Sequence, residues 1–199
     1  MNLWARIRML PAVCGALTVV MVLGAAAPSV ALPIPLVFGT VSIPLPVPLL
    51  LPLLPVCLIL HGQSRGDMEA EKVAVRPVGA CDAAAMAGLV ALACLVGVLE
   101  AWCGRTTGVA MGRDFAGYLG LALLIRWVGG PGAANVAVAL FPFACASFGI
   151  RPSGHPHVWA WPFHEPGSVP ATVMAAVLLV GGLVVARRDP LIKRQGDAE

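Results

Sequence analysis

Residues 81–102 read CDAAAMAGLVALACLVGVLEAW, and this stretch decides the class of the fold. Its few charged residues stand near its ends, Glu100 among them, and nearly every side chain between is apolar. An α-helix needs about 20 such residues to cross a hydrocarbon core of about 30 Å. The stretch therefore predicts a membrane-spanning helix.

The composition of the whole chain agrees with this stretch. Of the 199 residues, 59% are hydrophobic and 12% are charged, and the mean hydropathy is +0.88. Soluble domains carry about 25% charged residues, so this chain has too few charges to cover a surface in water. The values exclude a disordered chain and disfavour a soluble enzyme. We predict an all-α, polytopic transmembrane helix bundle that forms a single domain over residues 1–199.

Six apolar segments account for most of the chain. Two of them are short for a full crossing and are separated by Gly129-Gly130-Pro131-Gly132, a sequence typical of a tight turn. This pair is either two spans joined by the turn or one helical hairpin that does not fully cross, and we expect two spans. The predicted spans are residues 9–32, 41–60, 81–102, 115–130, 132–150 and 168–186.

Basic residues are unevenly distributed around these six spans. With the N-terminus inside, the inner side carries ten of the 13 Lys and Arg residues and the outer side carries three. Cytoplasmic loops are enriched in Lys and Arg, so we expect both termini in the cytoplasm. The inner set is Arg6, Arg8, Arg65, Lys72, Arg76, Arg126, Arg187, Arg188, Lys193 and Arg194, and the outer set is Arg105, Arg113 and Arg151.

The first segment has a second interpretation as a cleaved secretory signal. Arg6 and Arg8 precede the apolar stretch, and residues 25–27 and 29–31 offer small-residue cleavage sites. Cleavage would leave five spans and an N-terminus near Pro28 or Leu32. We expect an uncleaved helix, because the apolar run continues past both sites without a polar start.

Residues 33–55 contain seven of the 18 prolines, which break the second predicted span. Proline removes a backbone donor and clashes with the preceding helical turn, so Pro44-Leu45-Pro46-Val47-Pro48 is expected to be extended. Backbone of this kind is costly in contact with lipid. It is either a broken helix that enters from the outer face, completed by 49–60, or a discontinuous segment on a substrate path. We expect the broken helix.

Polar residues of the spans give no catalytic set. Glu100 and Arg126 are ionisable residues within predicted spans, which are functional candidates by default, although both are close enough to an interface to reach it. Neither a nucleophile–base–acid order nor a phosphate-binding glycine loop is present. The six cysteines lie mostly in apolar runs without zinc-site spacing. We therefore predict no catalytic residues and no cofactor.

The outer loop 150–168 combines histidines with aromatic residues. His155, His157 and His164 with Glu165 have suitable donor atoms for a transition metal, but their spacing matches no ligand signature, and we predict no metal. Trp159, Trp161 and Phe163 are instead expected to anchor the loop at the membrane interface, where tryptophan is enriched.

The inner loop 61–80 contains a short mixed-charge stretch that ends at Pro77. It is either a solvated connector on the inner leaflet or a docking surface for a cytosolic protein. The residues predicted to dock a partner are Asp67, Glu69, Glu71, Lys72 and Arg76.

Taken together, this arrangement resembles an ABC-2-type transporter permease of small actinobacterial type. The features are six spans, a helix with Glu69 and Glu71 before Arg76-Pro77-Val78, and an aromatic outer insert before the last span. The matching motifs are 113–121, which read RDFAGYLGL, and Trp159-Ala-Trp161-Pro162. The N-terminal connector of that family is reduced here to residues 2–8.

The resemblance implies a membrane subunit of an ABC-type exporter in a bacterial plasma membrane. It implies a homodimer that binds a separate cytosolic ATP-binding subunit through residues 64–77, since the chain has no ATP-binding motif. Two alternatives remain: a stand-alone membrane scaffold or immunity-type protein, and a lipid-modifying enzyme built on Glu100, Arg113, Asp114 and Arg126. With a net charge of +3 and dispersed basic residues, no nucleic-acid partner is expected.

Overall fold

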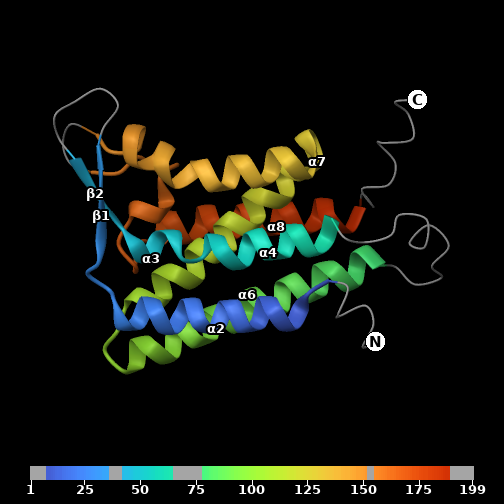
Figure 1. Cartoon of the computed structure of the whole chain (residues 1–199), viewed down its shortest axis with the longest axis horizontal. Helices are drawn as coiled ribbons and strands as arrows, with labels where there is room; N and C mark the ends of the chain where they lie inside the picture. Colours follow the sequence, from blue (N-terminus) through green and yellow to red (C-terminus); the bar gives the residue numbers. More distant parts are fainter. Residues whose placement is uncertain (1–7, 36–41, 65–77, 152–154, 189–199) are drawn as a thin grey trace.

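The computed structural model describes residues 8–35, 42–64, 78–151 and 155–188. The described residues are mainly helical, which confirms the all-α class, and a small β-hairpin is added (Figure 1). The longer helices are α2 (Leu10–Ala26), α4 (Leu53–Ser64), α6 (Val78–Trp102), α7 (Thr107–Phe148) and α8 (Val169–Arg188). The shorter elements are β1 (Ala31–Pro35), β2 (Ser42–Pro46), α3 (Val47–Leu50) and the 3-10 helix η1 (Trp161–Phe163).

Among the described residues, four helical stretches are long and apolar enough to cross a membrane. They are Val47–Ser64, Gly79–Trp102, Thr107–Phe148 and Val169–Arg187, and α2 is apolar but shorter. These helices support the prediction of a membrane protein. The predicted number of six is not reached by this count, because the 42 residues of α7 are counted once and α2 is too short to be included.

The proline-rich region is extended over a shorter stretch than predicted: extended backbone was expected over residues 44–48, but Val47 and Pro48 are already helical. The second span was expected from residue 41, but residues 42–46 pair with β1 in an antiparallel hairpin, in which Pro33 faces Pro44. Helical structure starts at Val47 and is interrupted between Leu50 and Leu53. Pro52 lies at this interruption, where it cannot donate the hydrogen bond that a continuous helix needs.

Two glycines fix the chain reversals around α7. Gly104 has φ +81° after α6, and the amide of Arg105 donates to the carbonyl of Glu100. This is the Schellman ending, in which glycine supplies the left-handed residue. Gly130 also has φ +81° and lies inside α7, within the turn predicted at residues 129–132. Pro131 follows it, so α7 consists of two helical legs that run in opposite directions (Figure 1).

The helices lie side by side, so that the connections gather at two ends of the bundle (Figure 1). The start of α2, the end of α4, the turn within α7 and the end of α8 lie at one end, which we call the terminal end. The β-hairpin, the connection between α6 and α7 and residues 155–168 lie at the other, which we call the hairpin end.

The first leg of α7 forms the centre of the bundle. Every residue from Met111 to Gly120 is buried, which is unusual for a helix that faces a neighbour on one side alone. Helix α8 crosses it closely: a Cβ atom on Gly182 would lie 2.7 Å from the carbonyl oxygen of Gly120. Glycine at both positions allows the two backbones to touch, as at many membrane helix crossings.

Candidate functional site

A polar cluster joins four segments at the terminal end, and we call it the Gln63 junction. Its members are Arg8, Gln63, Asp82, Met86 and Arg126. Arg8 precedes α2, Gln63 ends α4, Asp82 and Met86 begin α6, and Arg126 lies near the end of the first leg of α7. The junction therefore ties together the helices on both sides of residues 65–77.

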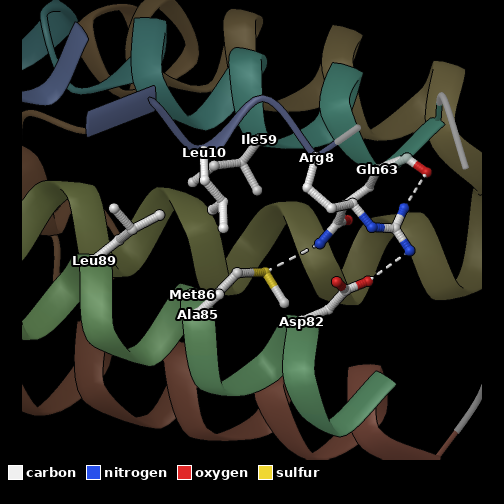
Figure 2. Close-up of a pocket in the computed structure, with 8 residues that line it drawn as sticks. All are labelled: Arg8, Leu10, Ile59, Gln63, Asp82, Ala85, Met86 and Leu89. Atoms are coloured by element: carbon white, nitrogen blue, oxygen red, sulfur yellow. Dashed lines mark hydrogen bonds and ion pairs between the residues drawn. The ribbon is translucent and has the colours of Figure 1, made fainter. Parts of the chain in front are cut away.

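Gln63 is the centre of this junction (Figure 2). Its backbone carbonyl accepts a hydrogen bond of 3.0 Å from Arg8 Nη1, and its side-chain oxygen accepts one from Arg126 Nη1. Its amide nitrogen lies 3.1 Å from the sulfur of Met86. Arg8 Nη2 also forms an ion pair of 2.8 Å with Asp82 Oδ2. One glutamine thus contacts three segments besides its own helix.

The Gln63 junction borders a small pocket between α2, α4 and α6 (Figure 2). Leu10, Ile59 and Leu89 form its apolar wall, and the polar groups of the junction form the opposite end. Arg8 and Arg126 are 8% and 7% exposed. Charges buried to this extent are costly unless they are paired and hydrogen-bonded, so the junction depends on its acceptors.

A second pair of charges lies inside the bundle towards the hairpin end. Arg113 and Asp114 are both buried in the first leg of α7, and Arg113 Nε lies 3.1 Å from Asp114 Oδ1. The remaining nitrogens of Arg113 donate to three backbone carbonyls beyond α7. The acceptors are Glu165 at 2.8 Å, His164 at 3.1 Å and Pro162 at 3.5 Å.

Aromatic side chains also hold residues 161–165 against α7. Trp161 is buried and stacks on Phe141 with a ring-centroid distance of 4.4 Å. Tyr118 packs against both rings and donates a hydrogen bond of 3.1 Å to the carbonyl of Leu49. The indole also lies against Gly117, where a Cβ atom would come within 2.6 Å of Trp161 Nε1.

Three buried polar atoms near the hairpin end have no hydrogen-bond partner among the described residues. They are Asp114 Oδ2, Trp161 Nε1 and Glu100 Oε2. Asp114 is 0% exposed and Trp161 is 3% exposed, whereas Glu100 is partly exposed at the end of α6. An unsatisfied buried group costs about 1–3 kcal/mol. The contact between Trp161 and the first leg of α7 therefore carries an energetic cost from unpaired polar atoms.

The histidines of the predicted outer loop make separate contacts. Arg151 Nε lies 3.3 Å from His157 Nδ1, and His164 Nε2 lies 3.1 Å from the backbone oxygen of His157. His155 is exposed. Among the described residues, no three His, Cys, Asp or Glu side chains are grouped as metal ligands would be.

The predicted site residues are distributed over several places. Asp67, Glu69, Glu71, Lys72 and Arg76 lie outside the described residues, so their docking role stays a prediction. Of the predicted anchor, Trp159 is 39% exposed, Trp161 is buried, and Phe163 packs against Leu45, Leu49 and Ala146. The four polar residues considered for an enzyme do not form one cluster: Arg113 and Asp114 are paired, Arg126 joins the Gln63 junction, and Glu100 lies at the end of α6.

No family model matches the chain, and no curated protein or solved structure is similar to it. The functional argument therefore depends on the geometry.

Sequence reasoning missed the Gln63 junction. Arg8 and Arg126 were recognised as basic residues on the inner side, but Gln63 and Asp82 were not singled out. A usable signal was present, since three successive segments each carry a polar residue near the same predicted membrane face. Their partners depend on helix rotation, which the apolar, weakly amphipathic segments do not specify.

Proposed function

We propose that the chain is the membrane subunit of an ABC-type exporter and that a separate cytosolic ATPase binds residues 64–77. The Gln63 junction is the observation that supports this most. Gln63 is the next-to-last residue of α4 and Asp82 lies in the second turn of α6, so both ends of the loop are fixed to the bundle. Asp82 pairs with Arg8, which directly precedes α2, and Gln63 binds Arg126 of α7, so the loop ends are also connected to these two helices.

The physical requirement behind this proposal is a rigid link. A permease that has no nucleotide site of its own must receive work through a contact with its ATPase. If residues 64–77 were only loosely connected to the helices, their displacement would not move the helices. Hydrogen-bonded charges in a partly buried place hold their partners firmly, so the junction would pass such a displacement to α2 and to the central leg of α7.

The proposed topology has six crossings in a bacterial plasma membrane, with both termini cytoplasmic. In it the two legs of α7 each cross, since they are about 34 Å and 27 Å long at about 1.5 Å per residue. The terminal end then faces the cytoplasm and the hairpin end faces outside. Helix α2 supplies Val13, Leu17 and Val20 to the core, which supports its retention in the mature protein. Two copies are expected by analogy with the resembled family.

The docking step is tested by purifying the tagged chain from its host in mild detergent. We expect an ATP-binding protein to co-purify with the wild type and to be lost from the Glu69→Lys, Glu71→Lys double variant. Charge at an interface chiefly determines partner choice and encounter rate. The matched control is Asp197→Lys with Glu199→Lys, which makes the same charge change in the C-terminal tail and should retain the partner.

A second variant separates docking from coupling. Gln63→Met keeps the length of the side chain but removes the acceptor for Arg126. We expect the ATPase still to bind, while the membrane subunit no longer changes its rate of ATP hydrolysis. If the wild type purifies without any ATP-binding protein and the Glu69, Glu71 reversal has no effect in cells, the exporter proposal fails and the stand-alone scaffold takes its place.

A further inference from the structure

We propose that residues 155–168 are a cap that closes the hairpin end of the bundle, and that the Arg113–Asp114 pair is the latch that holds it shut. The role of the cap in releasing an exported molecule rests on the proposed function. Its opening does not, and the experiment below measures the opening alone.

The latch consists of one side chain from the centre of the bundle. Arg113 binds three carbonyls within four residues of the cap, from Pro162 to Glu165. Its Nε binds Asp114, which is fully buried and supplies the balancing charge. A guanidinium has five donors in a fixed plane, so the single carboxylate orients all the nitrogens that hold the cap.

The packing beneath the cap favours reversible attachment. Trp161 Nε1 belongs to the cap and Asp114 Oδ2 to the latch. Both atoms are buried and have no hydrogen-bond partner among the described residues. Opening would expose both atoms to water and satisfy them, which offsets part of the cost of breaking the hydrogen bonds and the ring stacking. A permanent core contact would be expected to pair such atoms. The unpaired atoms thus lower the cost of opening at the place where the cap is held.

The remaining hydrogen bonds between the cap and the end of α7 lie close to the start of the cap. The amide of His157 donates to the carbonyl of Gly149, and Arg151 reaches His157 at an exposed site. These contacts tie the cap to the end of α7, whereas Trp161 and Phe163 are held by ring stacking and apolar packing. Releasing Arg113 would therefore leave residues 161–165 held by packing alone, while Gly149 and Arg151 still hold the start of the cap.

Cys145 is a natural reporter for this movement. Its side chain is 0% exposed, and it lies near Asp114 and Tyr118 beneath the cap. In a variant that keeps Cys145 and replaces the other five cysteines with alanine, a water-soluble maleimide would react at a rate set by cap opening. Purified full-length protein in lipid nanodiscs leaves both faces accessible, so the result does not depend on the topology or on any ATPase.

We expect Arg113→Gln in this background to raise the labelling rate of Cys145 by about tenfold or more, since hydrogen bonds from a charged donor are the strongest that the cap makes. Asp114→Asn should raise it as well, because Arg113 loses its counter-charge. The matched control is Arg151→Gln, which removes an exposed arginine that contacts the cap only at His157 and should leave the rate unchanged. Equal rates for Arg113→Gln and its parent, or equal increases for Arg113→Gln and Arg151→Gln, would overturn the latch.

A companion chain that keeps Cys57 alone detects unfolding. Cys57 lies within α4, outside the cap, and is half-buried, so its labelling rate should be the same in every variant that stays folded. If Arg113→Gln accelerates Cys57 too, Gly117→Ala decides the question. A Cβ there would displace the Trp161 indole and leave Arg113 intact. Faster labelling of Cys145 without faster labelling of Cys57 supports a cap that opens, and unchanged labelling of Cys145 refutes it.

Discussion

At the scale of single residues, Asp82 determines the charge balance of the Gln63 junction. The junction contains two arginines, each less than one-tenth exposed, and Asp82 is its carboxylate. Gln63 brings both guanidinium groups to one residue. Without the carboxylate, two like charges would share a site with low exposure to water, which is the costly arrangement of buried ions.

We therefore expect Asp82→Asn to lower the stability of the purified protein by about 1–3 kcal/mol. Thermal melting in detergent, followed by loss of the monodisperse peak, should show a Tm lower by several degrees. The control is Glu165→Gln, because the Glu165 side chain is exposed and its contact with Arg113 uses the backbone oxygen. Equal melting temperatures for the two variants would contradict the role of Asp82.

Individual side-chain contacts were predictable only in part. The sequence indicated that Arg113, Asp114, Arg126 and Glu100 lie near or within spans, and the first three are buried in the structure. It did not indicate that Arg113 binds the backbone of a later segment. Carbonyl acceptors occur at every residue and leave no pattern in a sequence, so the partner of such an arginine emerges from the packing.

At the scale of elements, the crossing of α7 and α8 brings two long helices into backbone contact. Gly182 faces Gly120 backbone to backbone, whereas a Cβ atom on the neighbouring Gly181 would meet Leu124 at 3.8 Å, an ordinary contact. Two adjacent glycines in one helix thus have different surroundings. This difference provides a matched pair of substitutions.

We expect Gly182→Ala to destabilise the protein by about 1–3 kcal/mol, because overpacking forces backbone shifts. Gly181→Ala should be neutral or should stabilise by up to about 1 kcal/mol, since alanine is the better helix former. Melting curves of both variants in the same detergent give the comparison. Similar losses of stability for both would mean that the two helices do not approach at Gly182.

The elements themselves were predicted well where a strong local signal exists. The Gly129–Gly132 turn and the proline break in the second segment follow from the conformational limits of glycine and proline. The pairing of 31–35 with 42–46 did not follow, because an extended proline-rich segment carries no indication of its partner. Segment boundaries moved accordingly, from residue 32 to Ala26 for the first and from residue 41 to Val47 for the second.

At the scale of the whole molecule, the described arginines are sorted by end. Arg8 and Arg126 both bind Gln63 at the terminal end. Arg187 lies next to Gly79, near the start of α6 at the same end. Arg105 follows α6, and Arg113 and Arg151 contact Glu165 and His157 of the hairpin end. The sequence assigns the first three to the inner side and the last three to the outer side, and the positive-inside rule makes the terminal end the predicted cytoplasmic end.

Truncation fusions to a paired cytoplasmic and periplasmic reporter test the six-span topology. Fusions after Gly79, Gly130 and Glu199 should all read cytoplasmic, and fusions after Gly104 and Gly167 should read external. Gly130 is the informative position, because an external reading there would mean that α7 does not cross twice. A mature N-terminus near Pro28 or Leu32, measured by mass spectrometry, would instead identify a cleaved first segment.

The proline-rich hairpin has a consequence for crowding on the membrane surface. The amide of Val47 donates to the carbonyl of Val30, so these two residues form a hydrogen-bonded pair. Hydrogen-bonded and non-hydrogen-bonded pairs alternate along an antiparallel ribbon. The pairs 31/46, 33/44 and 35/42 are therefore non-hydrogen-bonded, and their backbone groups point outward. Four of these six residues are prolines and have no amide hydrogen to offer. Both borders of the ribbon are thus largely stripped of donors, and neighbouring molecules cannot extend it into a fibril.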